Sequence, residues 1–205
     1  MEFEIPRTTF ADALALTQGV VERRNTLPIL SNVLIEGRDS TITLLATDLD
    51  VGIRATCPAT VKGSGAMTVS ARTLYEFTAK AGSDTIRLKT LDSGSVEFTS
   101  GRFKGRLPGL DPKEFPPVPG LTVKAAKGGG GMRVPAQLLV EMIERTLFAV
   151  SLDETRFNLS GVYTEGFDGG LRMVATDGHR LALVDRKIEG ELPKKGVILP
   201  RKGLA

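Results

Sequence analysis

The sequence repeats itself, and this internal repeat constrains the fold more strongly than any other feature. Ser31–Asp48 reads SNVLIEGRDSTITLLATD and Ser160–Asp177 reads SGVYTEGFDGGLRMVATD, so the two segments align without gaps at an offset of 129 residues. Two further pairs align at the same offset: Phe10–Val21 with Leu139–Val150, and Val69–Arg72 with Ile198–Arg201. Matching segments in the same order indicate two copies of one folding unit.

The repeat also divides the chain into domains. We assign residues 1–123 to the first copy, 124–131 to a linker and 132–205 to the second copy, because the linker ends in the glycine run Gly128–Gly131. At this offset the second copy lacks about fifty residues, the counterparts of Glu76–Val123, so its core and sheet would be incomplete. We therefore expect the chain to be a fragment of a longer protein.

Each copy is predicted to combine helices with antiparallel strands. Apolar residues follow helical spacing from Phe10 to Val21, with Thr9 as the expected N-cap, and Ala71–Lys80 is predicted as a second helix capped by Ser70. Elsewhere the apolar period is two, which predicts strands at 33–35, 42–44, 51–53, 85–91, 95–99 and 102–107. The pattern indicates an α+β fold, with two helices per domain on one face of antiparallel sheets.

Composition and charge exclude several classes of protein. The 27 Lys and Arg against 24 Asp and Glu give a net charge of +3, too small to mark a polyanion-binding protein by itself. Aromatic residues make up 5%, with no Trp, which argues against a surface that stacks single-stranded bases. No apolar stretch reaches the roughly 20 residues that span a bilayer, and the single Cys57 can form neither an internal disulfide nor a zinc cage. We expect a cytoplasmic protein without membrane segment, metal or cofactor.

Asp177 and His179 are candidates for a catalytic pair, because His179 is the single histidine of the chain. Such a pair could serve a hydrolase, but no G-x-S-x-G nucleophile motif accompanies it. Asp177 also recurs in the first copy as Asp48, which Leu49 and Asp50 follow in place of a histidine. A carboxylate that recurs without its partner is typical of turn chemistry, in which it accepts local backbone N–H groups.

The repeat also relates two basic residues. Arg72 and Arg201 align at the start of equivalent helices, so we expect both to face the same side. Repeated positive charge on one face suits the phosphate backbone of duplex DNA, a contact that is independent of sequence and weakens steeply with salt. A non-specific duplex DNA-binding module is one function that these residues leave open.

Four segments resemble a known family: TLPILSN at Thr26–Asn32, ATD at Ala46–Asp48, VATDGHRLA at Val174–Ala182 and PRKG at Pro200–Gly203. They are similar to signature segments of the bacterial DNA polymerase III β subunit, the family of replicative sliding clamps. The resemblance implies three like domains per chain, and two chains closed head to tail into a ring around duplex DNA, with helices inside and sheets outside. It also implies a non-catalytic processivity factor for DNA replication, which slides while it tethers the polymerase.

The resemblance further implies site residues. Arg24, Arg72 and Arg201 would contact DNA phosphates, and Phe103 and Leu107 would supply this chain's half of the ring contact. A partner pocket would receive linear peptides of the DNA polymerase III alpha subunit and the clamp loader through Leu159, Thr176, Gly178, His179, Arg180 and Leu181. For Leu159 and Leu181, the domain core is the competing interpretation. Because the third domain is absent, we expect that this chain alone closes no ring and holds peptides weakly.

Overall fold

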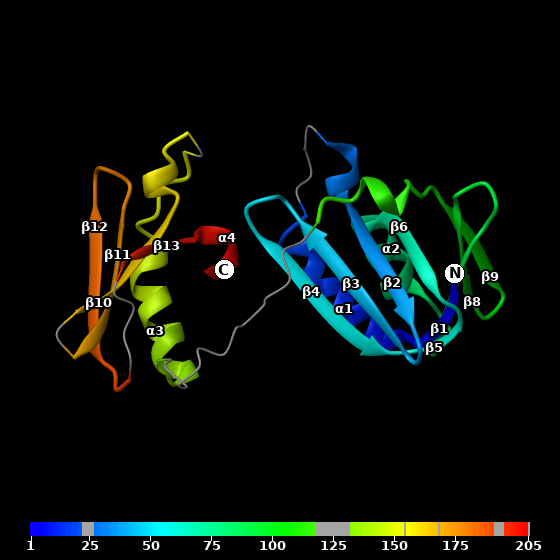
Figure 1. Cartoon of the computed structure of the whole chain (residues 1–205), viewed down its shortest axis with the longest axis horizontal. Helices are drawn as coiled ribbons and strands as arrows, with labels where there is room; N and C mark the ends of the chain where they lie inside the picture. The colour runs from blue at the N-terminus through cyan, green and yellow to red at the C-terminus, as the bar shows by residue number, and fades with distance from the viewer. Residues whose placement is uncertain (22–26, 118–131, 154, 168, 191–194, 205) are drawn as a thin grey trace. The chain divides into compact units, whose positions relative to one another are not determined.

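The computed structural model describes residues 1–21, 27–117, 132–153, 155–167, 169–190 and 195–204. They belong to two compact units, Met1–Pro119 and Gly120–Ala205 (Figure 1). The predicted linker 124–131 lies outside the described residues. Within the described part of the chain, no helix is long and apolar enough to cross a membrane.

The first unit contains two antiparallel sheets. Its described elements in chain order are β1 (Glu2–Pro6), α1 (Arg7–Gln18), η1 (Pro28–Ser31), β2 (Asn32–Arg38), β3 (Thr41–Thr47), β4 (Gly52–Pro58), β5 (Thr60–Gly63), β6 (Gly65–Ser70), α2 (Ala71–Lys80), β7 (Thr85–Thr90), β8 (Val96–Ser100), β9 (Phe103–Leu107) and η2 (Pro112–Glu114). One sheet has the order β4-β3-β2-β6 and the other β5-β1-β7-β8-β9, with antiparallel pairing throughout.

The core of the first unit joins both sheets to both helices. α1 contacts α2 and lies against β3 and β4, while α2 contacts β2 and β6 (Figure 1). Phe10 and Leu14 of α1 are fully buried one helical turn apart, and the ring of Phe10 meets that of Phe3 edge to face at 5.9 Å. Phe98 of β8 is fully buried in the same core.

The second unit reproduces half of this arrangement. Its described elements are α3 (Ala136–Leu147), η3 (Phe157–Leu159), β10 (Gly161–Phe167), β11 (Gly170–Thr176), β12 (Leu181–Lys187), β13 (Val197–Pro200) and α4 (Arg201–Leu204). The bounds of α3, β10, β11 and β12 lie 129 residues after those of α1, β2, β3 and β4. The sheet order β12-β11-β10-β13 matches β4-β3-β2-β6, so the predicted repeat and the α+β class are confirmed.

The N-terminal end of the first unit differs from the prediction. α1 begins at Arg7 with Pro6 as its N-cap and without a side-chain cap, so Thr9 lies inside the helix and its predicted capping role is wrong. Pro6 favours this earlier start, because the proline ring restricts φ, here −58°, to a value suited to a helix beginning. Proline also has no backbone N–H that would be left without an acceptor there. The predicted cap of α2 is confirmed, since the Ser70 hydroxyl accepts the backbone N–H of Thr73 at 3.4 Å.

The register of β13 corrects the predicted equivalence of Arg72 and Arg201. In the first unit Asn32 pairs with Ser70, whereas its counterpart Gly161 pairs with Pro200, one residue beyond the offset of 129. The connection from β12 to β13 is therefore one residue longer than that from β4 to β6. Arg201 takes the place of Ala71, and Lys202 takes the place of Arg72.

Candidate functional site

The turn between β11 and β12 is built by two adjacent side chains. The Thr176 hydroxyl donates to the carbonyl oxygen of Arg180 at 2.7 Å and accepts the backbone N–H of Gly178 at 3.1 Å. The Asp177 Oδ1 accepts the backbone N–H groups of His179 at 2.9 Å and Arg180 at 3.0 Å. These bonds hold residues 176–180 in one conformation at the end of the sheet.

The first copy uses the same turn. Thr47 donates to the carbonyl oxygen of Val51 at 2.9 Å and accepts the backbone N–H of Leu49 at 3.0 Å. The Asp48 Oδ1 accepts the backbone N–H groups of Asp50 at 3.1 Å and Val51 at 2.7 Å. The turn role predicted for the repeated carboxylate is therefore confirmed.

The environment of Asp177 does not suit a general base. The backbone N–H groups of His179 and Arg180, together with the Arg180 guanidinium at 2.9 Å, lower the pKa of Asp177 to about 2. Its oxygens bind the main chain of His179 and the side chain of Arg180. This geometry favours a structural carboxylate over an Asp-His hydrolytic pair.

The lowered pKa of Asp177 predicts an acid-sensitive turn. Because the folded-state pKa of about 2 lies below the ordinary 3.8, the turn is at full strength above pH 3.8 and loses its stabilisation as the pH falls toward 2. The backbone N–H chemical shifts of His179 and Arg180 should titrate with a midpoint near 2, and Asp177→Asn should abolish the step. A midpoint at 3.8 would contradict the assignment.

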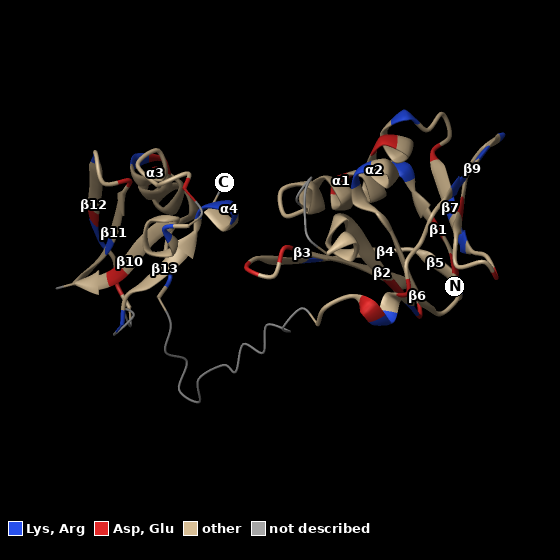
Figure 2. Cartoon of the chain, turned by 90° about the horizontal axis from the view of Figure 1, so that it is seen from above, with Lys and Arg blue, Asp and Glu red and all other residues tan. Residues whose placement is uncertain are grey.

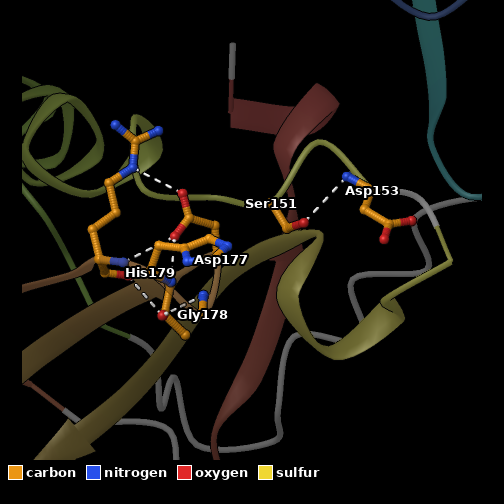
Figure 3. A network of polar contacts seen from close by, with 7 residues as sticks. Ser151, Asp153, Asp177, Gly178 and His179 are labelled. Carbon is orange, nitrogen blue, oxygen red and sulfur yellow. Dashed lines mark hydrogen bonds and ion pairs between the residues drawn. The ribbon is translucent and has the colours of Figure 1, made fainter.

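Apolar side chains surround this turn. Phe148, Leu152, Phe157 and Leu181 are 57%, 76%, 80% and 66% exposed, and Leu159 of η3 is half-buried. We call residues 148–153, 155–159 and 176–181 the corner surface. The backbone N–H of Ser151 binds the carbonyl oxygen of Leu159 at 3.0 Å and closes the first segment, and Figure 3 shows Ser151 and Asp153 beside the Asp177–His179 turn.

The structure thus gathers the six residues predicted for a partner site. Thr176 ends β11, Gly178–Arg180 form the turn, Leu181 begins β12 and Leu159 ends η3. Leu181 is too exposed to be core, which removes the competing interpretation for that residue. Sequence reasoning missed Phe148, Leu152 and Phe157, although a run of large apolar residues after a helix end was available as a signal.

The first copy covers the counterpart of Leu159. Leu30, the counterpart of Leu159, is 1% exposed and packs in a cluster with Ile29, Leu45 and Phe115. The segment that carries Phe115 is tied to the sheet by Thr68, whose hydroxyl donates to the carbonyl oxygen of Leu110 at 2.7 Å and accepts its N–H at 3.0 Å. The counterpart of Leu159 is therefore covered in the first copy, although Leu49 of the equivalent turn is 61% exposed there.

Gly178 occupies a backbone position that few residues tolerate. Its φ is +92°, and its counterpart Leu49 has φ +84°. We expect Gly178→Ala to lower the free energy of unfolding of the second unit by roughly 1–2 kcal/mol, the cost of a left-handed conformation for a side chain with a Cβ. Leu49→Gly is the matched change and should not destabilise the first unit. Chemical denaturation of both variants checks this, and equal losses would contradict it.

The residues predicted to contact DNA are spread over the two units. Arg24 lies outside the described residues. Arg72 is the second residue of α2, where it is exposed and bound to Glu76 at 2.8 Å, a bond that lowers the pKa of the Glu76 carboxyl. Arg201 is the exposed first residue of α4. Basic residues colour α4 and part of α2 in Figure 2.

The two residues predicted for the ring contact lie in different environments, one exposed and one buried. Phe103, on the edge strand β9, is 52% exposed and meets the rings of Phe77 at 5.7 Å and Phe98 at 6.1 Å. Leu107 is 2% exposed and belongs to the core of the first unit, so its side chain is not available to a second chain in this structure. Alternation along a strand predicts which residues share a face of the sheet. It does not predict whether a residue at the end of the strand, such as Leu107, is covered by the core.

The described residues contain no group of three or more His, Cys, Asp and Glu side chains that could hold a metal ion. The polar groups described on the corner surface are two arginines, two aspartates, the imidazole of His179, the amide of Asn158, hydroxyls and backbone amides, beside apolar side chains. This set can bind an apolar segment and orient its polar main chain.

Family models match both units. The N-terminal domain of the DNA polymerase III beta subunit matches residues 1–119, and the central domain of the same subunit matches residues 133–205. The chain belongs to the DNA polymerase III beta subunit family.

Its relatives are named beta sliding clamps. The chain is 39% identical over 214 residues to the beta sliding clamp of Caulobacter vibrioides, and 34% identical over 209 residues to that of Pseudomonas aeruginosa. These alignments cover 100% of this chain and 56% and 55% of the relatives, so the chain spans about half of their length.

Solved structures give the same result. A sliding clamp from Bacillus subtilis matches with a TM-score of 0.88 at 28% identity. A clamp from Bartonella birtlesii, bound to griselimycin, matches with a TM-score of 0.83 at 37% identity. Both alignments cover 100% of this chain and 55% of the solved chain.

Proposed function

We propose that this chain is part of a sliding clamp, which encircles duplex DNA as a head-to-tail ring dimer and tethers the replicative polymerase during DNA replication. The observation that carries the proposal is the match of both units, in order, to the two clamp-domain models. The protein would act in the cytoplasm without a cofactor and catalyse no reaction, because retention on DNA comes from the closed ring. Residues 1–123 and 132–205 would be its first domain and part of its second.

The contacts that support sliding are weak and independent of sequence. Arg72 already shares its guanidinium with Glu76, so its attraction for a phosphate is moderated. A base-specific grip would stop a moving ring, whereas phosphate contacts are the same at every step along the duplex. Phe103 and the edge strand β9 would form the contact between chains, without the side chain of Leu107.

The corner surface would receive linear peptides of the DNA polymerase III alpha subunit and of the clamp loader. Its exposed Phe148, Phe157 and Leu181 supply apolar area, and the turn at residues 176–180 supplies polar groups beside it. That a related clamp binds griselimycin supports the proposal and provides a probe for the site.

The topological role is tested by DNA with and without ends. The protein that contains this sequence, loaded onto nicked circular duplex DNA by a clamp loader, should remain bound during gel filtration in high salt. Cutting the circle once with a restriction enzyme should release it, since a ring slides off an end. Equal retention on linear and circular DNA would support the alternative, a non-specific duplex DNA-binding module.

The ion pair on α2 predicts opposite effects of two charge changes on DNA affinity. Arg72→Ala should weaken duplex binding and make the slope of log affinity against log salt shallower by about 0.9, the value for one phosphate contact. Glu76→Gln should strengthen binding at low salt, because it removes the carboxylate that Arg72 now binds. Fluorescence anisotropy with a labelled duplex measures both, and effects of the same sign would contradict the role of Arg72.

A further inference from the structure

Two segments of the corner surface carry the same pattern, Asp-x-x-Arg, at Asp153–Arg156 and Asp177–Arg180. In each, the aspartate Oδ1 accepts the backbone N–H two residues later, at 3.1 Å in the first segment and 2.9 Å in the second. In each, Oδ2 binds the Nε of the arginine three residues later, at 3.3 Å and 2.9 Å. One carboxylate thus caps the turn with one oxygen and holds an arginine with the other.

The two arginines border the same glycine. A Cβ atom built on Gly178 would lie 3.6 Å from the Nη1 atom of Arg156, and Arg180 belongs to the turn of Gly178 itself. Arg180 is held from a second side, because its guanidinium carbon lies 5.6 Å from the centroid of the Phe148 ring. Figure 3 shows Ser151 between Asp153 and the Asp177–Gly178–His179 turn, with the backbone N–H of Asp153 donating to the Ser151 hydroxyl at 3.1 Å.

We propose that Asp153 and Asp177 are positioning residues, which fix Arg156 and Arg180 so that their Nη groups bind main-chain carbonyl oxygens of a peptide on the corner surface. The inference rests on the peptide-binding role proposed above. The aspartates engage the Nε atoms, and each guanidinium carries four further N–H donors on its two Nη atoms.

The charge and exposure of the surface identify the occupant. Each arginine is paired with an aspartate, so the two pairs attract neutral carbonyl dipoles more than an acidic side chain. The exposed Phe148, Leu152 and Phe157 require an apolar covering beside these donors. The occupant is therefore an uncharged, apolar peptide. Arginines that are already fixed lose less side-chain entropy when it binds.

A double-mutant cycle tests the positioning role with griselimycin as the probe, measured by titration calorimetry on the protein that contains this sequence. Asp177→Asn keeps an oxygen that can accept the two backbone N–H groups but removes the charge that holds Arg180. We expect it to lower the association constant about 3- to 10-fold. In an Arg180→Ala background, the same change should have no further effect. Asp153→Asn should act in the same direction but less strongly, because its Nε contact is longer.

The first copy supplies a matched control. Asp48→Asn alters the same turn, in which Val51 stands where Arg180 stands in the second copy, and it should leave griselimycin binding unchanged. A readout without ligand is the hydrogen exchange of the Arg180 Nε–H in NMR spectra. Both Asp177→Asn and Phe148→Leu should accelerate this exchange while the backbone amide spectrum outside the corner surface stays unchanged.

The outcomes separate the two proposals. Unchanged or tighter griselimycin binding by Asp177→Asn, with wild-type binding intact, would overturn the positioning role and leave the peptide site standing. An unchanged Nε–H exchange rate would overturn it too. If the wild-type protein that contains this sequence binds no griselimycin, the proposed peptide site fails, and with it the use of the fixed arginines for a peptide.

Discussion

Replacement of Phe98 by alanine is expected to lower the free energy of unfolding of the first unit by about 3–5 kcal/mol. Phe98 is fully buried on β8, and its ring meets that of Phe77 edge to face at 5.6 Å. The change removes a large apolar side chain and leaves a cavity, because strands and helices packed on all sides cannot close around the gap. Chemical denaturation followed by circular dichroism measures the loss.

Phe103 provides the control for Phe98. Its ring belongs to the same aromatic group, at 6.1 Å from Phe98, but it is 52% exposed on the edge strand. Phe103→Ala should therefore cost about 1 kcal/mol, the value of an aromatic pair with little burial. Amide hydrogen exchange should show both losses in residues 1–117 and not in the second unit. A loss for Phe98→Ala no greater than that for Phe103→Ala would contradict the packing described above.

Met142→Ala should have the largest effect in the second unit, a loss of about 2–5 kcal/mol. Met142 is fully buried where α3 packs on β11 and β12. Its counterpart in the first unit is Ala13, but there the neighbouring Phe10 and Leu14 are fully buried and fill the space. In the second unit their counterparts, Leu139 and Ile143, are only half-buried, so fewer neighbours can refill the cavity. Hydrogen exchange of α3 and β11 measures the loss.

Val140 is the matched position for Met142. It lies on the same helix and is 52% exposed, so Val140→Ala removes little buried surface and introduces a better helix former. Its effect should be neutral or slightly stabilising. A comparable loss in both variants would mean that α3 responds to helix propensity and not to packing on the sheet.

Much of the fold could be predicted from the sequence because the repeat supplies two readings of each element. The Ala71–Lys80 helix and the strands β2, β3, β4, β7, β8 and β9 follow from the apolar period, and the offset carries β2, β3 and β4 to the second copy, whereas β5, β6 and β13 were not predicted. β1 was missed although Glu2, Phe3, Glu4 and Ile5 alternate, because a short N-terminal strand has no turn signal before it. The extra residue before β13 could not be predicted either, because Val69–Arg72 and Ile198–Arg201 align in sequence without a gap. Only the pairing of β13 with β10 shows that the register is shifted by one residue.

The site was predictable where chemistry is local and hidden where it depends on packing. Asp177 could be assigned to a turn because Asp48 repeats it without the histidine. The burial of Leu107 could not be predicted, because the alternation of a strand does not show where the core ends. The two Asp-x-x-Arg segments are visible in the sequence, but only the fold brings Arg156 beside Gly178.

The covering of Leu30 in the first unit bears on the stoichiometry of the proposed peptide binding. Two copies of one fold could offer two equivalent docking places, but Phe115 occupies the first from within the chain, where Leu30 is 1% exposed. The second keeps Leu181, which is 66% exposed, in place of Gly52. At the position of Leu159 the first copy is thus already covered from within the chain, so the peptides proposed to bind there would compete for the second copy.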